Sequence, residues 1–220
     1  MPGRDFFYLI GLRYQKHGKT VERSFWADEP EDELSIWHQF LRALGEIDNP
    51  RLIHYGAYES RFLKLMRERW QAADDGGALI ERIADGSTNL ISSIYGKIYF
   101  PTYSNSLKDI ARWLGFEWTW PHASGSGAIL LRRCWELTRD QRLQQQLIAY
   151  NIEDCRAAEL VTDAIERICR NSDDNDQGKL VINDHLFVRG VWWSTVQSAV
   201  PAGRTCQNLD GMSQRRQHTT

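Results

Sequence analysis

The sequence predicts an α/β domain, and three observations support this prediction. Residues 6–14 and 21–27 are rich in aromatic and β-branched side chains, and a His-Gly turn separates them, as in an antiparallel hairpin. Residues 28–70 then follow the pattern helix, strand, helix, which favours a parallel strand pair. Residues 143–168 repeat apolar side chains at intervals of three and four, which is one face of a long helix.

Composition narrows the class of protein. The 220 residues suit one domain, and 42% hydrophobic with 25% charged residues is ordinary for a globular protein. The net charge of −2 argues against a broad nucleic-acid-coating surface, but it is compatible with a basic groove beside an acidic site. No run has the length of a transmembrane helix, and the N-terminus is not a signal peptide. The four cysteines show no metal-ligand spacing and no convincing disulfide set. We therefore expect reduced thiols, a cytoplasmic location and no membrane partner.

The remaining elements follow in chain order. A helix capped at Asp28 ends before Pro50, residues 51–55 form a short strand, and residues 58–70 form the next helix. Residues 71–170 contain, in order, a polar loop (71–77), helical pieces (79–83 and 90–94), an extended stretch (98–103), a helix (106–114), a loop (118–127), a second helix (128–137) and the long helix. We expect residues 1–170 to form the domain, and residues 171–220 to be a linker and disordered tail, because they lose all clear periodicity.

Two residues interrupt the apolar stripe of the long helix. Tyr150 and Asp154 lie one turn apart in its middle. A carboxylate on a core-facing stripe is costly unless something compensates its charge, and a divalent metal would also supply chemistry. The alternative is a pair at the mouth of the core that is hydrogen-bonded to backbone.

A second candidate lies where the strand at residues 51–55 passes into the following helix. Ligand sites in open α/β sheets gather at such strand ends, and Glu59 would point at this opening. The alternative is that Glu59 is only a first-turn acid favoured by the helix dipole.

These patterns resemble a known group of enzymes. Tyr150-x-x-x-Asp154 resembles the third motif of the tyrosine form of the DEDD exonucleases, which are ribonuclease-H-like enzymes that remove nucleotides from 3′ ends. His54, Tyr58 and Glu59 fall at the offsets of their second motif, with His in place of Asn and Glu in place of Asp.

The chain more closely resembles one branch of that superfamily, the YprB-like ribonuclease-H-like domain of predicted RecB-family nucleases. The similarity spans about residues 2–170. It is carried by residues 4–12, 53–59, 99–116 and 150–155.

The resemblance implies a ribonuclease-H-like mixed sheet flanked by helices and a 3′–5′ exonuclease activity that uses two Mg²⁺ or Mn²⁺ ions. It implies Asp154 and Glu59 as metal ligands and Tyr150 as the hydroxyl that orients the attacking water. His54, Tyr55 and Tyr58 would bind substrate. The implied partners are nucleic acid, as a single-stranded 3′ end, and other domains of a larger nuclease.

The chain departs from the family pattern at its start. The superfamily's first motif is Asp-x-Glu on a central first strand, and in this branch it lies just before the stretch that matches residues 1–3. We therefore expect the first strand and two of the four acids to be missing, and the chain to be nearly inactive alone. The alternative function is a non-catalytic remnant with weak nucleic-acid binding, and a fold-level likeness without shared function is a third possibility.

Overall fold

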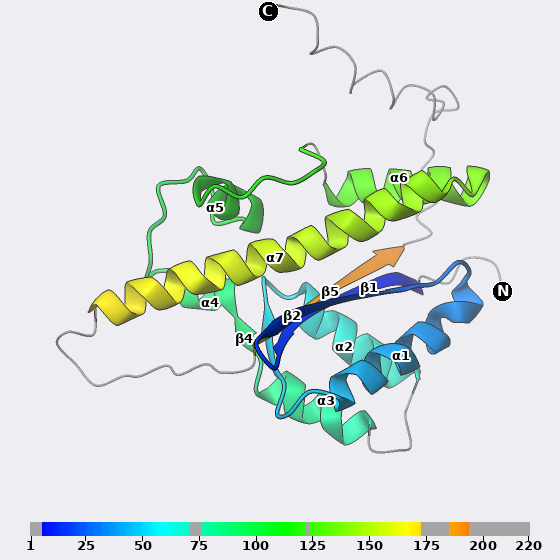
Figure 1. The fold of residues 1–220 in the computed structure, drawn as a ribbon, viewed down its shortest axis with the longest axis horizontal. Helices are drawn as coiled ribbons and strands as arrows, with labels where there is room; N and C mark the ends of the chain where they lie inside the picture. Colours follow the sequence, from blue (N-terminus) through cyan, green and yellow to red (C-terminus); the bar gives the residue numbers. More distant parts are fainter. Residues whose placement is uncertain (1–5, 71–75, 122–123, 173–184, 194–220) are drawn as a thin grey trace, which may run out of the picture.

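The computed structural model describes residues 6–70, 76–121, 124–172 and 185–193 (Figure 1). It confirms the mixed α/β class, with one five-stranded sheet in the order β2-β1-β5-β3-β4. The strands are β1 Phe6–Lys16, β2 Lys19–Trp26, β3 Arg51–His54, β4 Thr88–Asn89 and β5 His185–Trp193. The helices are the 3-10 turn η1 Pro30–Asp32, α1 Glu33–Gly45, α2 Tyr58–Arg69, α3 Gly76–Asp85, α4 Leu90–Ile94, α5 Leu107–Trp113, α6 Gly125–Thr138 and α7 Gln141–Ser172.

The predicted hairpin and the predicted long helix are both confirmed. β1 and β2 pair antiparallel up to Lys16 and Lys19. The turn residues His17 and Gly18 both have positive φ, as a two-residue turn of the hairpin type requires. α7 extends the predicted helix slightly at both ends.

The central strand comes from the last described part of the chain. β5 (orange in Figure 1) runs antiparallel to β1 and parallel to β3, and it joins these two strands into one sheet. The prediction that residues 171–220 are linker and tail is therefore wrong for residues 185–193. The sequence analysis expected a central strand of the sheet to be missing, and β5 is a central strand of the observed sheet. The sequence HLFVRGVWW has no period of two, and a central strand covered on both faces need not have one.

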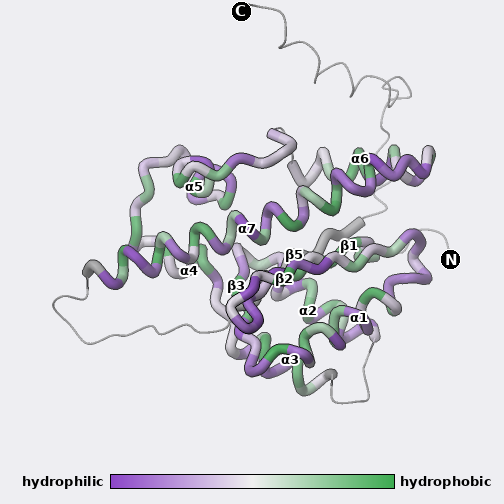
Figure 2. Tube along the Cα trace, viewed as in Figure 1, coloured by the Kyte–Doolittle hydropathy of each residue, from purple (hydrophilic) through white to green (hydrophobic). Residues whose placement is uncertain are grey.

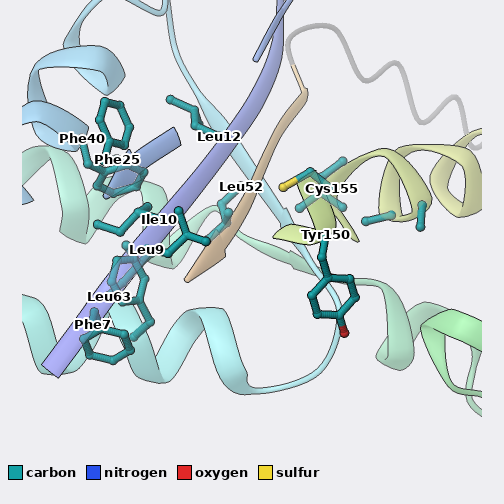
Figure 3. Close-up of a cluster of buried hydrophobic side chains, with 14 of the residues drawn as sticks. Phe7, Leu9, Ile10, Leu12, Phe25, Phe40, Leu52, Leu63, Tyr150 and Cys155 are labelled. Carbon is teal, nitrogen blue, oxygen red and sulfur yellow. The ribbon is translucent and has the colours of Figure 1, made fainter. Parts of the chain in front are cut away.

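Helices cover both faces of the sheet. Figure 1 shows α6 and α7 on one face and α1, α2 and α3 on the other. Between the sheet and α1 and α2, aromatic rings pack edge to face, with centroids 4.7 Å apart for Phe7 and Phe62 and 6.3 Å apart for Phe25 and Phe40. Figure 3 shows Phe7, Phe25 and Phe40 in this part of the core, and Figure 2 shows hydrophobic and hydrophilic residues alternating along α7.

The buried guanidinium of Arg132 anchors α6 to the β2 end of the sheet. It donates to the carbonyl oxygen of Ala27 at 2.8 Å and also to that of Asp28. The rings of Phe6, Tyr8, Trp26 and Trp135 surround it, with centroids 4.3–5.5 Å from its central carbon. These carbonyls and ring faces compensate a charge that would otherwise be costly to bury.

A close contact fixes α7 on β1. A Cβ added to Gly11 would overlap Oδ1 of the buried Asn151, lie 3.0 Å from its Cγ and lie 3.5 Å from Cδ1 of Ile152. Only glycine lets the helix approach this near. Because Asn151 directly follows Tyr150, this contact also sets the height of the candidate site above the sheet.

An ion-pair network holds α7 to the hairpin. Glu22 on β2 pairs with Arg13 on β1 and, at 2.6 Å, with Arg156 on α7. Arg13 in turn binds Glu159 on α7, with Nε 2.7 Å from Oε2. Hydrogen bonds from Arg156 first, and Arg13 in addition, hold the pKa of the Glu22 carboxyl below its usual value of 4.5, although burial opposes this shift.

Cys155 on α7 is a buried free thiol, and Cys169 further along the same helix is a half-buried one. Within the described ranges, no helix combines the length and the apolar character needed to cross a membrane.

Gly11→Ala should destabilise the fold because the new methyl group overlaps Asn151. We expect urea denaturation to show a loss of about 2 kcal/mol in the free energy of unfolding. Gly45→Ala is the matched control, since a Cβ there meets nothing within 4 Å, and it should cause no loss. Adding Asn151→Ala to Gly11→Ala should recover most of the loss, and a double variant as unstable as the single one would contradict the contact.

Glu22→Gln should lower stability in a pH-dependent way. A carboxyl whose pKa is depressed in the folded state contributes stability above its unfolded pKa, and this contribution is lost as the pH falls through the folded value. Since solvent screens this half-exposed pair, we expect a cost of about 1 kcal/mol at pH 7. The gap to the wild type should narrow below pH 4.5. Denaturation at pH 7 and 3.5 tests this, with the exposed Glu31→Gln as control, and an equal gap at both pH values would contradict it.

Candidate functional site

The buried middle of α7 carries Tyr150 and Asp154. Asp154 accepts a hydrogen bond at 2.9 Å from the indole N–H of Trp118, which lies in the loop after α5. The sequence analysis offered a metal or a backbone partner for this carboxylate. A side-chain donor thirty-six residues away supplies part of the compensation instead.

The same loop is fastened to the neighbouring carboxylate. The backbone N–H of Thr119 lies 3.1 and 3.2 Å from the two oxygens of Glu153, and its hydroxyl also donates to Glu153. Two consecutive acids of α7 therefore hold the loop with Trp118 and Thr119 in place. Sequence reasoning missed Glu153, because an acid beside Asp154 has no period that marks it as buried.

A cation and an aromatic ring lie against Tyr150. The ring of Trp120 meets it edge to face at 6.2 Å, and the ammonium of Lys108 lies 4.7 Å from its centroid. Lys108 also lies 5.6 Å from the ring of Trp118, so it bridges both aromatic neighbours of the site. In Figure 3 the Tyr150 hydroxyl points away from the core residues Leu52 and Cys155. No pattern in the sequence marks Lys108 for this role.

The junction of β3 and α2 holds the second set of predicted residues. Nδ1 of the buried His54 lies 2.6 Å from the carbonyl oxygen of Gly56, and its Nε2 lies 3.2 Å from Oγ of Ser60. Gly56 takes a positive φ of 89°, which turns the chain from the strand into α2. Both ring nitrogens of His54 are therefore engaged by its own turn. Glu59 follows in the first turn of α2 and is fully buried.

Tyr55 is tied to the segment before α5. Its hydroxyl donates to the carbonyl oxygen of Asn105 at 2.7 Å. Burial raises the pKa of Tyr55 to about 12, and the nearby Asp109 carboxylate adds to this rise. Tyr55 is thus a neutral hydrogen-bond donor near neutral pH that links β3 to the chain leading into α5.

The buried Tyr8 on β1 is influenced by one side chain from each predicted motif. Burial raises the pKa of Tyr8, and although the Arg132 charge opposes this, Tyr58 and Tyr150 add to the rise. Tyr58 begins α2 and Tyr150 lies in the middle of α7. The convergence of Glu59 with Asp154 in one cleft stays a prediction.

Whether these residues suit a two-metal centre depends on how many carboxylates they bring together. Carboxylate oxygens suit Mg²⁺ and Mn²⁺, and two ions need several of them. Among the residues that the structure describes, no three His, Cys, Asp or Glu side chains are grouped to hold a metal. β5 contains no Asp or Glu, and Oδ1 of Asp154 already accepts from Trp118. The described residues alone therefore do not fit such a centre.

Comparison with known proteins gives one match. A family model described as the RNase H superfamily matches residues 1–166. No curated protein and no solved structure matches the chain.

Trp118→Phe should destabilise the protein because Asp154 loses its indole donor while staying buried. We expect a loss of about 1–3 kcal/mol in the free energy of unfolding. Trp113→Phe is the matched control, since this half-exposed indole lies on the same helix–loop unit outside the site, and it should cost less than half as much. Asp154→Asn should reduce the effect of Trp118→Phe, as a double-mutant cycle can measure. Equal losses for both tryptophan variants would contradict the importance of this hydrogen bond.

Proposed function

Because the chain belongs to the RNase H superfamily, we propose that it acts on nucleic acid, as a domain of the metal-dependent 3′–5′ exonuclease type. Within the superfamily, the proposal assigns it to the YprB-like branch. The observation that carries the proposal is the Asp154 carboxylate buried on α7, one turn from Tyr150, whose ring lies 4.7 Å from the ammonium of Lys108. A buried acid, a tyrosine hydroxyl and a cation together suit the handling of a phosphodiester.

The proposed roles follow from the chemistry of each side chain. Lys108 and Arg112 would attract backbone phosphates, because both cations lie over the ring of Trp118, at 5.6 and 5.7 Å. The Tyr150 hydroxyl would orient a water molecule. Asp154 and Glu59 would supply two of the several oxygen ligands that a divalent ion needs, and the described residues do not group a third with them. His54, Tyr55 and Tyr58 would contact the substrate from the β3–α2 side. A single-stranded 3′ end is the substrate that the proposal favours.

A second candidate is a non-catalytic domain that only binds nucleic acid. Two observations favour this candidate. The central strand β5 contains no Asp or Glu, and the described residues contain no group of three possible metal ligands. Mg²⁺ releases its waters reluctantly, so an incomplete ligand set binds it weakly. Both candidates share nucleic-acid binding and differ in hydrolysis.

The 220-residue chain should bind labelled single-stranded DNA or RNA but degrade it very slowly with Mg²⁺ or Mn²⁺. Loss of carboxylates that bind the metal ions costs several kcal/mol of transition-state stabilisation, which lowers the rate about a thousandfold or more. Gel assays of 5′-labelled oligonucleotides over hours test this, with Asp154→Asn beside the exposed control Asp85→Asn. Rapid metal-dependent degradation that only Asp154→Asn abolishes would establish the exonuclease, and the ligand set would then be more complete than we expect. Absence of binding to any oligonucleotide would reject both candidates.

A further inference from the structure

The most exposed aromatic side chains gather in one segment. Within the described parts of the chain, the strongly exposed rings are Tyr95, Tyr99, Tyr103 and Trp113, with 76%, 89%, 103% and 52% of their surface accessible. All four come from residues 95–113, here called the aromatic arm, which spans the connection from α4 through α5 (Figure 1). The other strongly exposed large apolar side chains are aliphatic and lie on α6 and α7. Such a concentration of exposed rings is unlike single surface hydrophobics, which need no explanation.

The backbone of the aromatic arm is fixed although its rings are exposed. Phe100 is buried, and its ring meets Trp113 edge to face at 5.8 Å. Thr102 donates its N–H to the carbonyl oxygen of Phe100 at 2.8 Å and its hydroxyl to that of Ser104 at 2.9 Å. The Tyr55 hydroxyl holds Asn105 from outside the arm. Rings on such a fixed backbone lose little conformational freedom when a ligand covers them.

Cations are interleaved with these rings. The aromatic arm contains Lys97, Lys108 and Arg112 against a single acid, Asp109. The Asp109 carboxylate accepts from the Ser104 hydroxyl, and hydrogen bonds from serine side chains hold its pKa below the usual value. The arm is therefore locally basic in a chain whose net charge is −2. Exposed rings with cations between them suit a ligand that carries both flat faces and phosphates.

The aromatic arm is continuous with the candidate site. Lys108 belongs to α5 and lies 4.7 Å from the ring centroid of Tyr150 on α7. Arg112, one turn further along α5, donates to the carbonyl oxygen of Pro121 in the loop that carries Trp118. A strand that lay along the arm would therefore reach the Tyr150–Asp154 side chains from α5.

We propose that the aromatic arm binds single-stranded nucleic acid, stacking bases on Tyr99 and Tyr103 and passing the strand towards Tyr150. This inference rests on the proposed function and names the surface that would select the form of the substrate. Unpaired bases offer free faces to aromatic rings, whereas the bases of a duplex are already stacked on each other. The arm should thus favour single strands over duplexes and show little preference among base sequences.

The test measures binding of the full chain to a fluorescein-labelled dT16 oligonucleotide by anisotropy, in EDTA so that no hydrolysis occurs. We expect Tyr99→Ala with Tyr103→Ala to weaken binding about tenfold or more, because each lost base stack contributes substantially. Tyr99→Phe with Tyr103→Phe should bind within about twofold of the wild type, since stacking does not need the hydroxyl. Lys97→Gln should make the plot of log affinity against log salt concentration less steep, by roughly the amount that one phosphate contact contributes. Leu137→Ala, which removes a side chain that is 68% exposed on α6, is the matched control and should change nothing.

The outcomes separate this inference from the function on which it rests. If the wild type binds dT16 and the double alanine variant binds equally well, the inference is overturned and the proposed function stands. Wild-type chain that binds neither dT16 nor a 16-residue RNA would overturn both. Tighter binding to a 16-base-pair duplex than to dT16 would overturn the inference. Sedimentation could also show that the wild type self-associates and that the double alanine variant does not, while both bind dT16 equally. This result would overturn the inference as well, because the aromatic arm would then be an interface between copies of the chain.

Discussion

The contact between Gly11 and Asn151 is the constraint on which the placement of the site depends. α7 crosses the sheet where Gly11 of β1 has no Cβ, so the Asn151 side chain occupies the space that a Cβ would fill. Asn151 faces the sheet there, and the site residues Tyr150 and Asp154 are its neighbours on α7. The reach from Asp154 to Trp118 follows from this helix height. The buried Arg132 and the Glu22 network then fix the position of the two helices on that face.

Local patterns predicted the parts of the fold that depend on neighbouring residues. The hairpin follows from alternation and one turn, and α7 follows from apolar side chains that recur at intervals of three and four over residues 143–168. What the sequence could not show depends on partners far away in the chain. β5 is a strand because β1 and β3 flank it, and Trp118 belongs to the site because its indole reaches an acid on another element. Neither relation leaves a period in the sequence.

The fold and the chemistry of this molecule point in different directions. The chain has the sheet, the flanking helices and the family match of a superfamily in which many members cut nucleic acid. The site, however, brings a carboxylate together with indole, ammonium and phenol groups, and its central strand contributes no acid. A fold can persist while its catalytic groups change, so the surface that contacts nucleic acid can outlast the groups that cut it.

The position of β5 determines when the domain can be completed during synthesis. β1 ends at Lys16, but the strand that pairs with its inner edge is made only at residues 185–193. At ordinary translation speeds the interval is on the order of ten seconds or more. Throughout that time the facing edges of β1 and β3 have no neighbour from this sheet, and open edges of this kind recruit other strands. Until β5 is made, the nascent chain therefore holds two incomplete half-sheets, β2-β1 and β3-β4, and β5 is the strand that joins them.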